Sequence, residues 1–483
     1  MMFQTSLKRW ATVVALLVLT TLVEARSLQG RLEAILESTN LGEASVAFHV
    51  LDLSDGLGVA EMNADAPMIP ASNMKLITTA AAAVLFDNDF EFRTRLYQRG
   101  DSLIVVGDGD PAFADPKILG AMNMNVEDLL LRWVETVKKA DVKKVDRIII
   151  DDRIFDRQRV HPNWPTDQLH QWYCAEVAGL NFNNNCLDIY ATPTQLGESP
   201  IIRTQPLNAP VVLTTAARTG RKNAVWPTRD PGTNRITIRG EVKHRLTRPI
   251  YVTVDDPSMF FAKTFRDRLV SEGVTVDRIE RADDDFKIDG ARLIAEVRTP
   301  LREVLARCNK DSQNLFAEAL IKRIGHEATG DPGSWASGSA AIRMFLSKSL
   351  GPDASKFVID DGSGMSRENR LTGALLCQLL YRMDRMGEVG RTYRHSLAVG
   401  GEDGTLRARF QGRELESTVY AKSGYLRGVL ALSGYVVHEK KTYAFSIIVN
   451  DYRKATYIAK RMMDRMVQEM DRELTGDARR NPD

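Results

Sequence analysis

The sequence predicts an α/β (α+β) fold in which helices flank an antiparallel sheet and a large, mostly β insertion interrupts the chain. Strand-like segments near both termini, with helical segments between them, suggest that the two ends of the chain share one sheet. The middle of the chain has a different pattern, in which short strand-like runs are separated by turns rich in Gly, Asp and Pro.

The segments at the two ends follow clear patterns. Residues 28–38 (LQGRLEAILES) have the apolar spacing of a short amphipathic helix, and residues 45–63 predict a β-hairpin around a Ser-Asp-Gly turn. A helix follows at 70–86 (PASNMKLITTAAAAVLF). Near the C-terminus, STVYAKSG, GVLALSGYVVHE and TYAFSIIVN predict three successive strands, and a helix at 456–474 closes the chain.

The chain length of 483 residues suits two or three domains. We expect one discontinuous domain formed by residues 26–92 and 290–475. Residues 93–194 and 243–289 form an inserted domain II, and residues 195–242, with many Thr, Arg, Pro and Gly, form a domain III. Residues 476–483 are a loose tail.

The composition excludes some classes of protein. Net charge is only +2, with no basic stripe or acidic tail, so a nucleic acid partner is not indicated. The four cysteines and seven scattered histidines lack metal-ligand spacing. We therefore expect no metal site and no cofactor.

The first 25 residues have the pattern of a secretory signal peptide. A basic pair precedes an apolar run at 10–23, and Val-Glu-Ala at 23–25 fits a cleavage site. An uncleaved anchor is the alternative, but the apolar run is shorter than the roughly 20 residues that span a bilayer. We expect a periplasmic or otherwise exported protein with no stable membrane anchor after cleavage.

Export makes a disulfide between Cys174 and Cys186 plausible. The two residues are twelve positions apart in WYCAEVAGLNFNNNC, a spacing that a local disulfide closes if the segment turns back. Two buried thiols are the alternative. Cys308 and Cys377 resemble small core residues.

The segment at 70–86 also contains Ser72 and Lys75, an S-x-x-K pattern at the start of a helix. Residues three apart share a helix face, so a lysine amine can remove the serine proton if burial or a neighbouring cation disfavours its charge. The pattern is weak by itself, because a capping serine beside a solvated lysine looks the same.

Two further motifs follow in order. Ser312-Gln313-Asn314 precedes a helical segment, where Ser and Asn are also ordinary capping residues. Lys422-Ser423-Gly424 lies in a strand, where the lysine could instead protect a sheet edge. S-x-x-K, S-x-N and K-[ST]-G in this order form the signature of penicillin-recognising serine enzymes.

The chain resembles one branch of these enzymes, the class C low-molecular-mass penicillin-binding proteins, which are D-alanyl-D-alanine carboxypeptidase/endopeptidases of the penicillin-binding-protein-4 type. Ser72 and Ser312 are 240 residues apart, and Ser312 and Lys422 are 110 apart, as expected for a family with a large two-part insertion between the first two motifs. GDGDPAF, DDRIFD, SQNLFAEAL, DDGSGMSREN and VGGEDGTLRARF are also similar to the family. The resemblance implies a penicillin-recognising serine transpeptidase-like domain, with peptidoglycan stem peptides and β-lactams as partners.

The resemblance also implies roles for single residues. Ser72 is the nucleophile, Lys75 is its base and is kept partly neutral by Lys422, and Ser312 relays a proton to the leaving amine. Asn314 binds Lys75 and the substrate amide. The remaining assignments are the backbone N–H groups of Ser72 and Tyr425 as oxyanion hole, and Lys422, Ser423 and Gly424 at the substrate carboxylate.

Two positions depart from the family or align loosely with it. Tyr425 stands where relatives often carry a small hydroxyl residue that holds the terminal carboxylate, which favours endopeptidase over carboxypeptidase work slightly. Asp167, in NWPTDQLHQ, resembles an acidic position that touches the amine of diaminopimelate in relatives; an ordinary loop aspartate is the alternative.

Two other functions fit parts of the sequence. A serine β-lactamase uses the same nucleophile, but the long insertion argues against it. A non-catalytic wall-binding protein could keep the fold, but it has no need for Ser72, Lys75, Ser312, Asn314 and Lys422 together. The sequence leaves open the oligomeric state, the balance between the two peptidase activities, and the third residue of the stem peptide.

Overall fold

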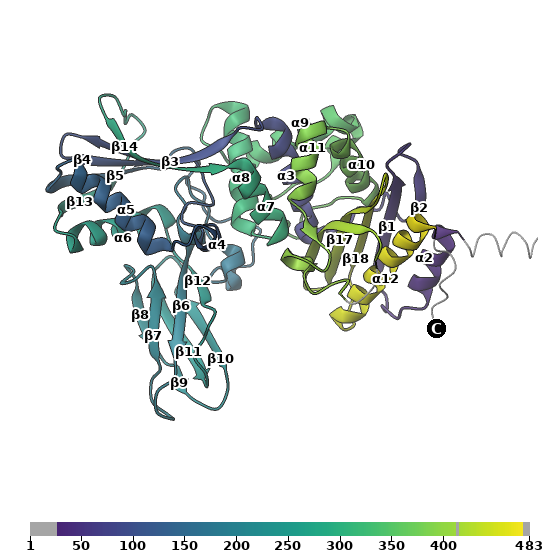
Figure 1. The fold of residues 1–483 in the computed structure, drawn as a ribbon, viewed down its shortest axis with the longest axis horizontal. Coiled ribbons are helices and arrows are strands. Elements are labelled where there is room, and N and C mark those ends of the chain that lie inside the picture. Colours follow the sequence, from purple (N-terminus) through teal and green to yellow (C-terminus); the bar gives the residue numbers. More distant parts are fainter. Residues whose placement is uncertain (1–26, 412–414, 477–483) are drawn as a thin grey trace, which may run out of the picture.

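The computed structural model describes residues 27–411 and 415–476. The predicted signal peptide, and the predicted tail beyond residue 476, lie outside these residues. The molecule is elongated, with a sheet from both chain ends at one side and the inserted strands and helices at the other (Figure 1). None of the helices in the described part of the chain is long and apolar enough to cross a bilayer.

A six-stranded antiparallel sheet, in the order β15-β16-β17-β18-β1-β2, is built from both ends of the chain. β1 and β18 pair from Ser45 opposite Asn450 to Asp52 opposite Tyr443. This pairing confirms that the two chain ends share a sheet. The strands are β1 (Ser45–Asp52), β2 (Gly58–Met62), β15 (Ala398–Val399), β16 (Thr418–Leu426), β17 (Val429–His438) and β18 (Lys441–Asn450).

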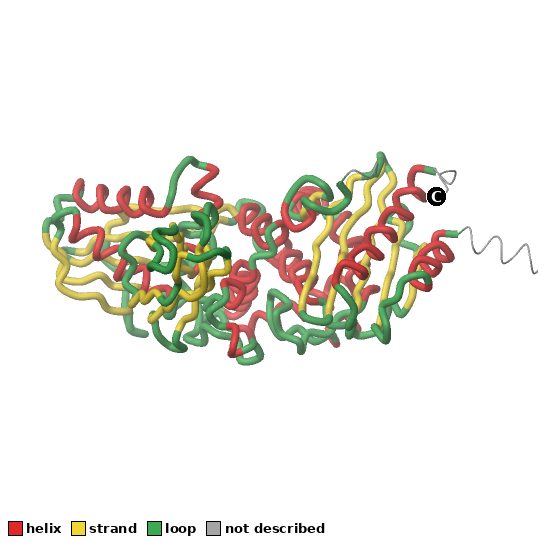
Figure 2. The backbone as a smooth tube through the Cα atoms, turned by 90° about the horizontal axis from the view of Figure 1, so that it is seen from below, coloured by secondary structure: helices red, strands yellow, loops and turns green. Residues whose placement is uncertain are grey.

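Helices cover both faces of this sheet (Figure 2). On one face lie α2 (Leu28–Glu37) and α12 (Thr456–Thr475). Because strand side chains alternate between faces, Val50 of β1 packs with these two helices and Leu51 packs in the opposite core. The opposite face is covered by α3 (Met74–Leu85), α7 (Leu301–Lys310), α8 (Asn314–Thr329), α9 (Trp335–Leu350), α10 (Gly373–Asp384) and α11 (Gly387–His395).

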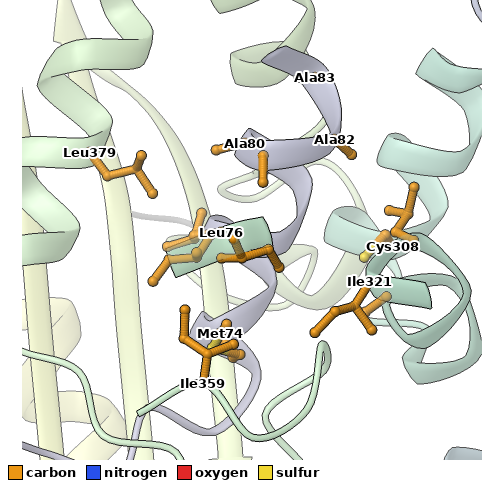
Figure 3. Close-up of a cluster of buried hydrophobic side chains, with 14 of the residues drawn as sticks. Met74, Leu76, Ala80, Ala82, Ala83, Cys308, Ile321, Ile359 and Leu379 are labelled. Atoms are coloured by element: carbon orange, nitrogen blue, oxygen red, sulfur yellow. The ribbon is translucent and has the colours of Figure 1, made fainter. Parts of the chain in front are cut away.

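The helix α3 lies inside this second layer and is buried from Met74 to Ala83. Its alanines leave room for the neighbouring helices to approach closely. Figure 3 shows Ala80 and Leu76 of α3 among side chains that include Cys308 of α7 and Leu379 of α10. The start of α3, which carries the S-x-x-K motif, is therefore held by packing on several sides.

The insertion begins after α3 with a five-stranded sheet in the order β13-β5-β4-β3-β14. β4 and β13 each run parallel to β5, whereas β3 runs antiparallel to both of its neighbours. The helices α5 and α6 pack on this sheet. The elements are β3 (Glu91–Arg99), β4 (Ser102–Val106), α4 (Pro116–Ala121), α5 (Val126–Lys139), β5 (Lys144–Asp151), α6 (Pro257–Ser271), β13 (Thr275–Arg281) and β14 (Arg292–Pro300).

Two smaller sheets project from the insertion (Figure 1). One has the order β12-β6-β7, and the other has the order β10-β11-β8, with β9 also pairing with β11. Their strands are β6 (Cys186–Thr192), β7 (Ile201–Gln205), β8 (Val212–Thr215), β9 (Arg218–Thr219), β10 (Ala224–Arg229), β11 (Arg235–Val242) and β12 (Ile250–Thr253).

The four cysteines are free, buried thiols, so the predicted disulfide between Cys174 and Cys186 is wrong. Cys174 packs in the core around α3, whereas Cys186 opens β6 and its neighbour Leu187 packs in the core of the insertion. The segment between the two cysteines thus runs from one core to another instead of turning back. Hydrogen bonds hold this segment; in one of them Asn185 Nδ2 donates to Asn181 Oδ1 at 2.7 Å.

Candidate active site

Ser72 lies in the short 3₁₀ turn Ala71–Asn73, which leads directly into α3. Its Oγ is 3.1 Å from Nζ of Lys75, one helical turn further on. Ala71, immediately before the serine, has a left-handed backbone with φ of 46°. This conformation is costly for a residue with a side chain and is kept only where packing imposes it, so the serine occupies a sharp, fixed turn.

The amine of Lys75 has three polar neighbours. It donates to Asn314 Oδ1 at 2.7 Å and to the backbone carbonyl of Ser363 at 2.9 Å, and the third neighbour is Ser72 Oγ. The two carbonyl oxygens can only accept hydrogen bonds. They therefore take both N–H bonds of a neutral amine and leave its lone pair for the hydroxyl of Ser72. This geometry fits a base that removes the serine proton.

Burial makes the neutral form of Lys75 accessible. It is the largest influence on this amine and lowers its pKa from 10.5 to about 8, against the opposing effects of Cys308, Glu318 and Asp361. Burial, and then the charge of Lys75, also lower the pKa of Lys422 well below its usual value. The sequence analysis named Lys422 as the cause of a neutral Lys75, but the structure gives burial that role.

The second motif lies between two helices. α7 ends at Lys310 and α8 begins at Asn314, while Ser312 between them has a left-handed φ of 57°. Its Oγ accepts a hydrogen bond from Lys422 Nζ at 2.9 Å. Asn314 binds Lys75 through its oxygen and donates through Nδ2 to the backbone carbonyl of Tyr173 at 2.8 Å. Residues of all three motifs are therefore in contact with one another.

The third motif lies on β16, whose outer edge is open at this point. β15 pairs with only Tyr420 and Ala421 of this strand. The N–H of Gly400 donates to the carbonyl of Val419 at 2.9 Å, which shows that Val419 directs its backbone groups to the outer edge. Since alternate residues of an antiparallel strand face the same side, the backbone N–H of Tyr425 also points to this edge.

Gly424 brings this edge close to the serine. A Cβ at this position would be 2.9 Å from the carbonyl of Pro70 and 3.1 Å from the backbone nitrogen of Ser72. Only glycine permits this approach without a shift of the backbone. It allows the strand that carries the Tyr425 N–H to lie against the turn that carries the Ser72 N–H. An oxyanion hole formed by these two groups stays a prediction.

Thr405 and Tyr425 are neighbours of the third motif. Ser423 Oγ donates to Oγ1 of Thr405 at 2.8 Å, so two hydroxyl groups are adjacent near Lys422. Tyr425 is 58% exposed and points into solvent. Thr405 was not among the residues predicted from the sequence, although it lies in the VGGEDGTLRARF segment that carries part of the family resemblance.

A buried carboxylate holds the loop that supplies the Ser363 carbonyl. Glu318 of α8 accepts hydrogen bonds from the backbone N–H groups of Gly362 and Ser363 at 3.0 and 2.8 Å, and from the indole of Trp335 at 2.7 Å. Burial raises the pKa of Glu318 to about 7. Glu318 was not predicted from the sequence, although a glutamate inside the apolar run NLFAEALI is a usable signal.

Asp361 holds the other side of the same loop. Its oxygens accept from the backbone N–H groups of Gly364 and Ser366 at 2.8 and 2.7 Å, from Asn369 Nδ2 at 2.9 Å, and from the indole of Trp164 at 3.0 Å. Asp361 is thus fully engaged in holding this loop. Trp164 belongs to the insertion, which therefore braces this loop.

Asp167 lies on the insertion, in the exposed 3₁₀ turn Thr166–Gln168. It is near enough to Cys174 that its charge adds to the effect of burial, which raises the pKa of that thiol to about 12. Tyr173, next to Cys174, is the residue whose carbonyl binds Asn314. Asp167 therefore lies near the segment of the insertion that contacts the site, and its contact with substrate stays a prediction.

Comparison with known proteins agrees with this geometry. Residues 28–472 match the model of the D-Ala-D-Ala carboxypeptidase 3 (S13) family. The chain belongs to this family. It is 32% identical to the D-alanyl-D-alanine carboxypeptidase of Actinomadura sp. strain R39, over 87% of this chain and 80% of that protein.

Solved structures of other proteins share the fold. The crystal structure of penicillin-binding protein 4 from Haemophilus influenzae matches with a TM-score of 0.73 at 20% sequence identity, and covers 93% of this chain and 99% of its own. The same protein in complex with a novel β-lactam matches with a TM-score of 0.69, at the same identity and coverage. The family and the fold class predicted from the sequence are thus confirmed.

Proposed function

We propose that this S13 protein is an exported serine D-Ala-D-Ala carboxypeptidase/endopeptidase that acts on peptidoglycan stem peptides and is acylated by penicillin. The observation that carries the proposal is the fixed Lys75 amine, whose two carbonyl acceptors leave its lone pair to the hydroxyl of Ser72. Such a pair is what a serine nucleophile with a lysine base requires.

The proposed reaction begins at the contact between Ser72 and Lys75. Lys75 takes the Ser72 proton while Oγ bonds to the carbonyl carbon of the penultimate D-Ala. The resulting oxyanion is held by the backbone N–H groups of Ser72 and Tyr425, each worth about 3 kcal/mol of transition-state stabilisation. The C–N bond then breaks, and the proton passes from Lys75 through Ser312 to the leaving amine. Water hydrolyses the ester and restores Ser72.

The carboxylate of the leaving D-Ala lies, in this proposal, near Lys422, Ser423 and Thr405. The ammonium of Lys422 supplies positive field, and an arriving carboxylate favours its charged form despite burial. The adjacent hydroxyls of Ser423 and Thr405 can donate to the same group. In the same proposal, Asp167 binds the amine of a diamino acid at the third position of the stem.

The test is the intact mass of the purified mature protein with and without benzylpenicillin, beside a Ser72→Ala variant. We expect a lasting adduct of one drug mass on the wild type and none on the variant. A drug that is consumed without a lasting adduct would indicate a β-lactamase. An intact drug and an unmodified protein would indicate a wall-binding protein without this chemistry. Cross-linked and uncross-linked wall fragments would then measure the two peptidase activities.

A further inference from the structure

A positively charged pocket of about 590 Å³ adjoins the active site where β16 turns into β17 and α12 begins. Among the residues that the structure describes, Arg427, Arg453 and Lys454 form no ion pair, and all three are exposed. Four cations face one carboxylate in the pocket, which leaves it strongly positive. Its charged lining comprises Arg367, Arg427, Asp451, Arg453 and Lys454, and Tyr425 also lines it.

The first turn of α12 adds to this positive field. Thr456 lines the pocket, and the helix has neither an acidic residue in its first turn nor a side-chain cap at its N-terminus. The N-terminus of a helix carries a partial positive charge. Arg367 reaches the same place, because its guanidinium donates to the backbone carbonyl of Arg427. A pocket with this balance fits an anionic group.

The position of the pocket along β16 shows which part of a substrate reaches it. In the proposed reaction, the leaving carboxylate lies at Lys422 and Ser423, and the reacting carbonyl lies at the N–H of Tyr425. The acyl part of the substrate must therefore extend in the other direction along the open edge, towards Arg427. β16 ends at Leu426, and Arg427 lies in the turn directly after it, two residues and at most about 7 Å beyond Tyr425.

The acyl part of a stem peptide carries an anion at a comparable distance. The glutamate two residues before the reacting D-Ala is linked through its γ-carboxyl group, so its α-carboxylate is free. Two extended residues span about 7 Å. An extended peptide that adds to the open edge of β16 would bring this carboxylate to the pocket, while its backbone pairs with the strand.

We propose that Arg427, Arg453 and Lys454 form a subsite for the free α-carboxylate of this γ-linked glutamate. The inference rests on the proposed function. The subsite makes the enzyme prefer stem peptides with a free carboxylate to those in which the same group is amidated. A primary amide has no charge, so it loses the attraction of the pocket without a change in shape.

The test compares two soluble pentapeptides that differ only at this α-carboxylate, which is free in one and a primary amide in the other. Release of D-Ala gives kcat/KM for each. For the wild type we expect a five- to tenfold higher kcat/KM for the free carboxylate, a modest ratio because exposed charge pairs are screened by water and salt. Raising the salt concentration to about 0.5 M should bring the ratio towards one.

The variant Arg427→Gln, Arg453→Gln, Lys454→Gln should hydrolyse both peptides at the rate that the wild type shows for the amide. A control with the same change of charge replaces exposed lysines on the β17–β18 turn and on the projecting sheets, and should keep the wild-type ratio. This control is Lys243→Gln, Lys440→Gln, Lys441→Gln. Acylation by benzylpenicillin should be equal in all three proteins, since the drug lacks the glutamate.

Equal kcat/KM values of the wild type for the two peptides would overturn the subsite, and this comparison requires no variant. So would a full preference in the variant that lacks the three cations. If the wild type is acylated by penicillin but hydrolyses both peptides with equal kcat/KM, the subsite is refuted and the proposed function is not. If the wild type neither reacts with penicillin nor releases D-Ala, the proposed function is refuted, and the subsite is refuted with it.

Discussion

The lowered pKa of Lys75 predicts a steep pH dependence of acylation. The amine acts as base only when neutral, and its pKa is about 8 instead of 10.5. At pH 7 about 9% of the amine is neutral, against about 0.03% at the ordinary pKa, which is roughly a 300-fold gain in active base. Between pH 6 and pH 9 the neutral fraction should rise from about 1% to about 90%.

The assay is the rate of formation of the penicilloyl adduct from pH 6 to pH 9 at constant ionic strength. The carboxylate of the drug stays ionised throughout, so the profile reports the enzyme. We expect the rate to rise about tenfold per pH unit below pH 7, to reach half of its maximum near pH 8, and to level off above pH 9. A flat profile over this range, or a midpoint above pH 10, would refute the role given to Lys75.

A substitution close to the lysine should move this profile in a defined direction. The charge of Glu318 raises the pKa of Lys75, so Glu318→Gln should shift the midpoint to lower pH. The maximal rate should also fall, because an amide has only one oxygen to accept from Gly362, Ser363 and Trp335. A shift of the midpoint to higher pH would contradict the electrostatic argument.

Three further predictions follow from the same contacts. Ser312→Ala should slow acylation roughly 10²–10⁴-fold while the protein stays folded, because it removes the proton relay; rapid-quench kinetics and circular dichroism measure the two effects. Trp164→Phe removes the indole N–H donated to Asp361 and should cost about 1–3 kcal/mol in unfolding free energy, measured with denaturant. Thiol titration of the denatured, unreduced chain should give four thiols; a count of two would restore the disulfide between Cys174 and Cys186.

The motifs were predictable because their chemistry is encoded in side chains. An S-x-x-K pattern specifies a helical face, so the contact between Ser72 and Lys75 follows from local geometry once the helix is assumed. The order of the motifs, and the strand pattern around Lys422, then allowed Ser312, Asn314 and Lys422 to be predicted as part of the same site. The sheet shared by both chain ends was visible because its strands have clear apolar runs.

The backbone partners of the site were not predictable in this way. The carbonyls of Ser363 and Tyr173 bind Lys75 and Asn314, but every residue has a carbonyl, so no residue type marks them. The disulfide prediction failed for a similar reason. Separation in sequence does not show which core a residue joins, and Cys174 and Cys186 belong to different surroundings. The cause of the lowered pKa of Lys75 was not predictable either, because it is burial, and burial is known only from the folded chain.

These backbone contacts also tie the insertion to the candidate active site. The Tyr173 carbonyl fixes the amide of Asn314, whose oxygen then has to face Lys75. The Trp164 indole fixes Asp361 and with it the loop that presents the Ser363 carbonyl. Both acceptors that determine the direction of the Lys75 lone pair are thus supported from the insertion. A chain without the insertion would keep all three motifs but would lose these two hydrogen bonds, which restrain Asn314 and the loop of Ser363.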